Sequence, residues 1–273
     1  MRRMLSPAPR IMIAIRQKSL LTRSSSNRFL PVCALATLLI SLTTGTCTGQ
    51  SPGEMYHPLN HRMPPGMAAG MLNSVRGYNP SYLQPVRVEL PTDGIVSVYS
   101  ASTAPSGNAR TPAQFSINAG HVYRLRLSEL PELPGAEIYP TIELLDHLHP
   151  PAGMEHNFPV PVVFSLDDLQ VALSGKLVTR IIYLEQPSMA QLLDPLRREI
   201  PQTVSPADNA LKEADRLGRP IAIVRIGGRT PAGPDDAQFY YGTGGGVDMT
   251  VPEIRNPGFV RLSSDARPAL ASN

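Results

Sequence analysis

The stretch Pro159–Gln186 constrains the fold most, because it has the pattern of a strand, a helix and a second strand. Its first six residues are apolar, and three of them are valine, as in a buried strand. Ser165 and Asp168 then have the spacing of a capping box, with Asp in place of the usual Glu. Gly175 is the kind of residue that ends a helix, and 177–185 has the composition of a strand. The pattern predicts a compact strand–helix–strand unit.

Short strand patterns separated by turn residues lead up to this unit. Asp-Gly at 93–94 and Asn-Ala-Gly at 118–120 are turn sequences that can join the two strands of a hairpin. The predicted strands are 86–90, 95–99, 114–117, 121–127, 137–145, 159–164 and 177–185. About seven short strands at such spacings predict an α+β fold that is mainly β. We expect a sandwich, immunoglobulin-like or prealbumin-like, extended by capped helix–strand units.

One such extension follows Pro187. Residues 189–200 have helical leucine spacing, and Ser205 and Asp208 repeat the capping-box spacing. Gly218 would end the second helix, ahead of an apolar strand over 220–226.

The sequence predicts five parts along the whole chain. They are an export segment over 1–49, a Pro- and Met-rich tether over 50–84, a β-sandwich domain over 85–186, a helix–strand extension packed on it over 187–230, and a disordered tail over 231–273. The tail includes the Gly-rich run 242–246.

The N-terminal residues have the layout of a secretory signal. A short apolar run, Phe29–Leu42, follows a cationic stretch and precedes small and hydroxyl residues. The run is shorter than the roughly 20 residues that a transmembrane helix needs. It predicts export to the periplasm, the cell envelope or the exterior, with a translation start at Met1, Met4 or Met12. Cleavage, a retained membrane anchor, and lipidation at Cys47 all remain open, although the residues before Cys47 do not match the usual lipoprotein pattern.

The basic charge of the chain is concentrated in this segment. Seven of the 25 Lys and Arg residues lie in the first 28 positions, and no acidic residue occurs before Glu54. The remainder has 18 basic and 22 acidic residues, a net charge of −4. Nucleic-acid binding is therefore not expected, since it depends on a cationic surface. Without the apolar run, which contains Cys33, the chain keeps only Cys47 and has no internal disulfide.

Two stretches resemble known groups of proteins. FSINAGHVYRLRLSELPELPGAEIY resembles the prealbumin-like or immunoglobulin-like modules of bacterial surface proteins. VFSLDDLQVALSGKLVTRIIYLEQP and ADRLGRPIAIVRIGGRTP together resemble an uncharacterised family of exported bacterial envelope proteins, over about 85–231. That resemblance implies export and a shared domain, but no activity, substrate or site.

Histidines supply the candidate metal ligands. His147 and His149 would lie on one side of a continued strand, and His156 could return across the following loop. Three imidazoles suit Zn or Cu, whereas the competing interpretation is a solvated loop. A second, weaker candidate is a Cu(I) site in the tether, formed by Met55, His57, His61, Met63, Met67 and Met71.

No local motif predicts catalysis or a cofactor. The chain has no G-x-S-x-G or H-E-x-x-H, and 242–246 lacks the Lys of a phosphate loop. Asp167 and Asp168 fit helix capping better than acid–base chemistry. We expect a non-catalytic interaction module that contacts an envelope protein or polysaccharide, with N-terminal membrane anchorage possible. Its candidate surfaces are a sheet edge or an exposed tyrosine region (Tyr99, Tyr123 and Tyr139). Arginines near strand ends could bind an acidic partner, although such residues more often pair with surface carboxylates; they are Arg180, Arg225 and Arg229. A metal-binding protein and a hydrolase with a dispersed site are the alternatives.

Overall fold

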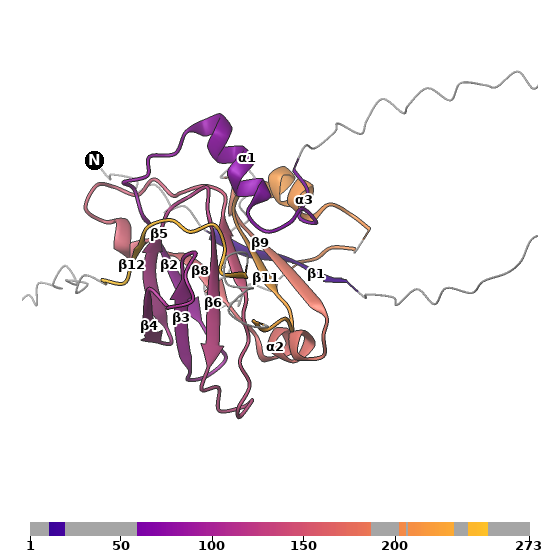
Figure 1. Ribbon diagram of the computed structural model, residues 1–273. Coiled ribbons are helices and arrows are strands. Elements are labelled where there is room, and N and C mark those ends of the chain that lie inside the picture. Colours follow the sequence, from indigo (N-terminus) through magenta and orange to yellow (C-terminus); the bar gives the residue numbers. More distant parts are fainter. Residues whose placement is uncertain (1–10, 20–58, 187–201, 206, 232–239, 251–273) are drawn as a thin grey trace, which may run out of the picture.

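The computed structural model describes residues 11–19, 59–186, 202–205, 207–231 and 240–250 (Figure 1). The fold is α+β and mainly β, with two sheets, which confirms the predicted class. The strands are β1 (Ile11–Ser19), β2 (Gln84–Glu89), β3 (Ile95–Tyr99), β4 (Gly107–Arg110), β5 (Ala113–Ile117), β6 (Val122–Ser128), β7 (Thr141–Leu144), β8 (Val160–Val163), β9 (Leu177–Glu185), β10 (Gln202–Thr203), β11 (Gly218–Ile226) and β12 (Val247–Asp248). The helices are α1 (Met67–Arg76), α2 (Leu166–Leu173) and α3 (Ala210–Leu217), with a 3-10 turn, η1 (Glu155–Asn157).

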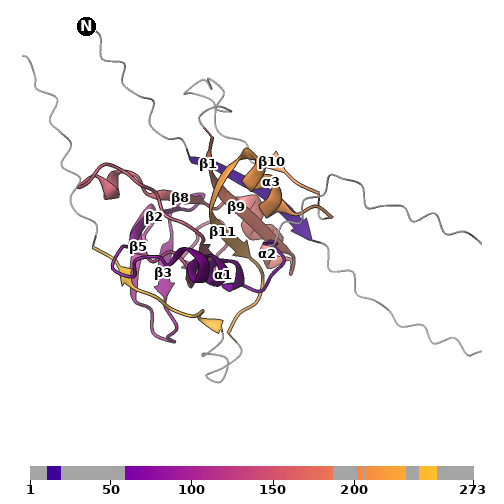
Figure 2. The same ribbon diagram turned by 90° about the horizontal axis from the view of Figure 1, so that it is seen from above.

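The two sheets enclose the main hydrophobic core. One sheet has eight strands in the order β10-β1-β9-β11-β7-β6-β3-β4, and the other has four in the order β12-β5-β2-β8. Alternate residues of β6, Tyr123, Leu125 and Leu127, are fully buried, whereas the two arginines between them are half-buried. Figure 2 shows the four-stranded sheet on one side and the β9 end of the larger sheet, with α2 and α3, on the other.

The predicted strand–helix–strand unit is confirmed as β8, α2 and β9. Ser165 and Asp168 form both halves of the capping box. Asp168 has a further role that its spacing does not indicate: its fully buried carboxylate forms an ion pair with Arg180 on β9. Arg180 also donates from Nη1 to the carbonyl of Val163, at 2.7 Å. The cap thus connects the helix to both of its flanking strands.

Strand β1 lies within the segment that the sequence assigns to export, where no strand was predicted. It pairs with β9 in antiparallel orientation and with β10 in parallel orientation. Removal of 1–49 would therefore take away the strand that lies beside β9. A processed and an unprocessed chain differ in this sheet as well as in their N-termini.

The prediction of a tether over 50–84 is wrong for its described part, 59–84. Helix α1 lies there, and its Ala68 and Ala69 are fully buried. The amide of Ala69 donates to Oε1 of Glu143 in β7, at 2.9 Å. Small side chains let this helix approach the sheet closely, and its short apolar face is hard to recognise among prolines and methionines.

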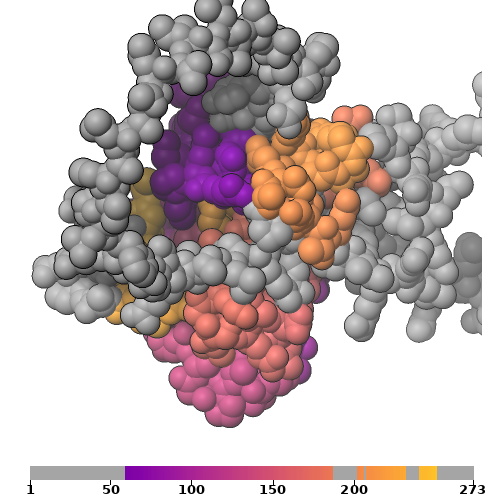
Figure 3. All heavy atoms as spheres, turned by 90° about the vertical axis from the view of Figure 1, so that its right-hand side faces the viewer, coloured from indigo at the N-terminus to yellow at the C-terminus, as the bar shows by residue number. Residues whose placement is uncertain are grey.

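Helix α3 begins later than the Ser205 spacing predicts. Its N-cap is Asn209, whose Oδ1 accepts the Leu211 amide at 3.1 Å. Asn209 also donates from Nδ2 to the carbonyl of Leu59, at 2.8 Å, so a contact with the chain before α1 favours this start. Helices α1 and α3 pack in one buried cluster and lie side by side in Figure 3, in purple and orange. The helix predicted over 189–200 lies outside the described residues.

The prediction of a disordered tail over 231–273 is wrong for residues 240–250, whereas 232–239 and 251–273 lie outside the described residues. Strand β12 pairs with β5, and Tyr240 is buried. The Gly-rich run 242–246 lies against β6 and the loop before it, where an added Cβ at Gly242 would come within 2.5 Å of the carbonyl oxygen of Val122. Glycine is therefore needed here for close packing, not for linker flexibility.

Candidate functional site

A pocket of about 190 Å³ lies between the loop after β7 and strands β9 and β11. Its lining residues are Leu148, His149, Pro150, Pro151, Phe158, Leu184 and Arg219. Most of this lining is apolar, and consecutive prolines fix the backbone of one wall. His149 and Pro151 are exposed, so the pocket meets solvent at the surface.

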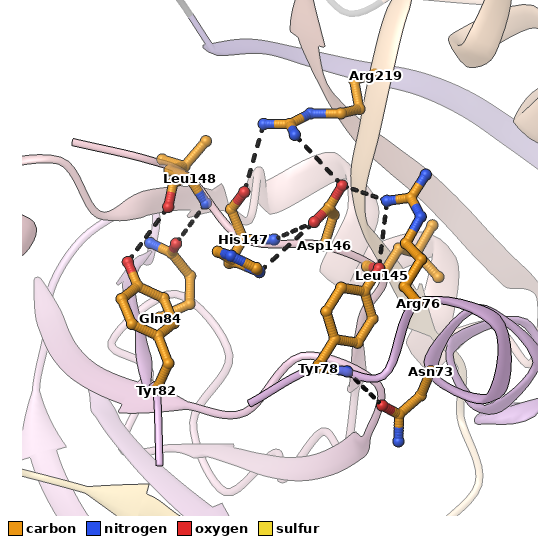
Figure 4. A network of polar contacts seen from close by, with 10 residues as sticks. All are labelled: Asn73, Arg76, Tyr78, Tyr82, Gln84, Leu145, Asp146, His147, Leu148 and Arg219. Atoms are coloured by element: carbon orange, nitrogen blue, oxygen red, sulfur yellow. Dashed lines mark hydrogen bonds and ion pairs between the residues drawn. The ribbon is translucent and has the colours of Figure 1, made fainter. Parts of the chain in front are cut away.

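Buried hydrogen bonds hold the loop that forms one wall of the pocket. The amide of Leu145 donates to the carbonyl of Ile221 in β11, at 2.8 Å. Three residues on, the Leu148 amide donates to Oε1 of the fully buried Gln84, at 2.7 Å. Figure 4 shows Gln84 and Tyr82 together beside Leu148, whose carbonyl accepts the Tyr82 hydroxyl at 3.2 Å. The wall is thus fixed before any ligand binds.

Two arginines converge on one buried carboxylate beside this pocket (Figure 4). Asp146, with a side chain only 4% exposed, accepts from Arg76 Nη1 at 2.5 Å. The same oxygen, Oδ2, lies 3.5 Å from Arg219 Nη1. Arg219 Nη2 also donates to the carbonyl of His147, at 3.3 Å. One negative charge therefore faces two positive charges, and the more distant arginine is the one that lines the pocket.

His147 does not add a third positive charge beside Arg76 and Arg219 at neutral pH. Its ring stacks on His149 with centroids 4.5 Å apart, and the rings of Tyr78 and Tyr82 lie 5.7 and 5.0 Å away. Burial lowers the pKa of His147 below its ordinary value, and His149 and the two arginines act in the same direction against the opposing effect of Asp146. The electrostatic character of the site therefore depends on Asp146 and its arginines.

The structure brings together two of the three predicted metal ligands. His147 and His149 stack, whereas His156 lies in η1, where its carbonyl accepts Gln114 Nε2 at 3.0 Å. Among the described residues, no group of three or more His, Cys, Asp or Glu side chains is arranged to hold a metal ion. A site formed by all three histidines stays a prediction.

The other predicted ligands are divided between the described and undescribed parts of the chain. His61 is buried, and its Nδ1 accepts the Ala210 amide at 3.2 Å. Burial lowers the pKa of His61, and the positive charges of Arg62 and Arg225 act in the same direction. This histidine connects α3 to the chain before α1. Met55, His57 and Cys47 lie outside the described residues.

The prediction of an exposed tyrosine region is wrong. Tyr99, Tyr123 and Tyr139 are 4%, 0% and 7% exposed. Tyr241 lies 4.7 Å from Tyr99, and Tyr240 lies 5.8 Å from Tyr139, between ring centroids. The C-terminal segment therefore covers the surface that the strands alone would leave open. Burial also raises the pKa of Tyr123 to about 12.

The three arginines near strand ends have partners within the chain, and two of them pair with carboxylates, which was the favoured interpretation. Arg180 is paired with Asp168. Because this ion pair occupies Asp168, the two neighbouring carboxylates Asp167 and Asp168 do not form an acid–base pair. Arg225 is paired with Glu143 at 2.5 Å, and the Arg229 guanidinium lies 5.4 Å from the centroid of the Tyr240 ring.

The sequence indicated His147 and His149 as candidate ligands, but it did not indicate Arg219 or the apolar walls of the pocket. The sequence places Arg219 directly after the glycine that ends α3. Nothing near it in the sequence identifies Asp146 as its partner.

Within the described residues, no helix is both long and apolar enough to cross a membrane. Comparison of the chain with protein-family models, with curated proteins and with solved structures found no match. The resemblance over 85–231 therefore stays an expectation.

Proposed function

We propose that this chain is an exported, envelope-associated, non-catalytic interaction module that binds its partner through the pocket at Leu148, Phe158, Leu184 and Arg219. The observation that carries the proposal is this preformed apolar pocket with Arg219 at its edge. Asp146, the carboxylate partner of Arg219, only partly neutralises the positive charge of its guanidinium. A concave apolar site with a few convergent polar groups is the usual form of a binding site. Its apolar lining favours a protein or other apolar ligand over a polysaccharide, whose hydroxyl groups need many hydrogen-bonding partners.

Asp146 positions Arg219 in this proposal and does not act as a proton donor or acceptor. Its Oδ1 accepts the His147 amide at 2.8 Å, and its Oδ2 faces Arg76 and Arg219. The carboxylate is nearly inaccessible, since its side chain is 4% exposed. These contacts support a structural role that holds the guanidinium at the edge of the pocket.

The binding proposal predicts that the full chain takes up a small neutral apolar probe at this pocket. Titration with n-hexanol should shift the methyl NMR signals of Leu148 and Leu184. The methyl signals of Leu133, a partly buried leucine that packs against the main core, should stay unchanged and serve as the matched control. Shifts at Leu133 with none at Leu148 and Leu184 would contradict the proposed site.

The export proposal predicts a processed N-terminus. Mass spectrometry of the protein from its native cells should find the first residue between Thr44 and Ser51, or an acylated Cys47. Export is supported by the cationic stretch and apolar run at 1–42. An intact Met1 on a soluble intracellular protein would exclude it.

A further inference from the structure

The pocket combines an apolar lining with a positive charge. Arg76 and Arg219 face Asp146, and no acidic residue is among the described residues that line the pocket. Since Arg76 is the closer partner of Asp146, the unbalanced positive charge is centred on Arg219. A ligand that supplies one negative charge at Arg219 completes the pairing.

We propose that the pocket binds a monocarboxylate attached to a short apolar group, with the carboxylate at Arg219 and the apolar group against Leu148, Phe158 and Leu184. This inference deepens the proposed function and rests on it. The carboxylate has two sources, a free short-chain acid or the carboxyl terminus of a polypeptide that ends in an apolar residue.

The hydrogen-bonding capacity of Arg219 supports a carboxylate. A guanidinium carries five N–H donors in a planar fork. The structure commits Nη2 to the His147 carbonyl at 3.3 Å and directs Nη1 toward Asp146 at 3.5 Å. Donors therefore remain for a second acceptor, and the planar fork matches the two oxygens of a carboxylate. A phosphate monoester, with a charge of about −1.5 to −2, would overcompensate the single unbalanced charge.

The size of the pocket limits the apolar part of the ligand. A volume of about 190 Å³ is below the roughly 300–1,000 Å³ of sites for drug-sized ligands. The pocket therefore fits one short apolar group and excludes a long acyl chain. Because His149 and Pro151 are exposed at its edge, a polypeptide could extend from the site into solvent.

The test compares two probes of equal chain length, hexanoate and n-hexanol, by calorimetric titration of the full chain. We expect hexanoate to bind more tightly than n-hexanol, and Arg219→Gln to weaken hexanoate binding about tenfold to a hundredfold and n-hexanol binding much less. Arg219→Lys, which keeps the charge but loses the fork, should give an intermediate result. The matched control is Arg87→Gln, at a surface arginine with a 44% exposed side chain, against 39% for Arg219. It should change neither affinity.

A second pair of probes identifies the source of the carboxylate. N-acetylated Ala-Ala-Leu with a free carboxyl terminus should bind more tightly than its C-terminal amide if the natural ligand is a polypeptide end. Binding of hexanoate without the peptide indicates a free short-chain acid; either result supports the carboxylate. Equal affinities for hexanoate and n-hexanol would overturn the carboxylate inference but leave the proposed binding function standing. An equal loss of affinity for both probes on Arg219→Gln would do the same. Binding of neither probe would overturn the proposed function together with it.

Discussion

Replacing Glu143 by alanine should lower the free energy of unfolding of the full chain by about 3–5 kcal/mol. The Glu143 side chain is fully buried, and its Oε2 accepts Arg225 Nη1 at 2.5 Å. Its Oε1 accepts the Ala69 amide of α1 at 2.9 Å. The substitution leaves a guanidinium that is only 7% exposed without its counter-charge, and an amide without its acceptor. The loss is large because neither group can reach water without disturbing the packing of α1 on the sheet.

Urea denaturation followed by circular dichroism measures this loss. The matched control is Glu89→Ala, which removes the acid from an exposed Glu–Arg pair at 3.0 Å and should cost about 1 kcal/mol or less. The double substitution Glu143→Leu with Arg225→Met should recover much of the loss, since it removes both buried charges. A change for Glu143→Ala as small as that for Glu89→Ala would show that the buried pair contributes little to stability.

Gly242→Ala should lower the free energy of unfolding by about 2–4 kcal/mol. Gly242 has a φ of +84°, and a Cβ there would lie 2.5 Å from the carbonyl oxygen of Val122. Backbone conformation and backbone contact therefore both oppose a side chain. Because Gly242 bridges to Tyr123, the substitution should also loosen the segment that covers the buried tyrosines. Tyrosine fluorescence during urea denaturation reports both changes.

Gly153→Ala separates the two contributions to that loss. Gly153 has a φ of +80° and no neighbouring atom within 4 Å of an added Cβ. It should therefore show only the conformational cost, about 1–2 kcal/mol. Equal losses at Gly153 and Gly242 would mean that the contact with Val122 adds nothing, and that the Gly-rich run does not depend on close packing.

The local elements could be predicted from the sequence because neighbouring residues encode them. The capping box at Ser165 and Asp168 and the glycine at 175 define α2 within a few positions. Asn209 could also have been recognised as a helix cap, but the Ser205 spacing competed with it, and the contact to Leu59 that favours Asn209 comes from a distant part of the chain. Local signals identify possible helix starts, and tertiary contacts select among them.

The sequence by itself determined that the chain is mainly β, where most of the strands lie, and how α2 begins and ends, because alternation, caps and turns act over a few residues. Only the tertiary structure decided that α1 packs on the sheet, that residues 240–250 cover the tyrosines, and that Arg219 shares Asp146 with Arg76. These outcomes depend on which surfaces and charges meet after folding. The free energy of a buried charge is set by its spatial neighbours, and these are far from it in the sequence.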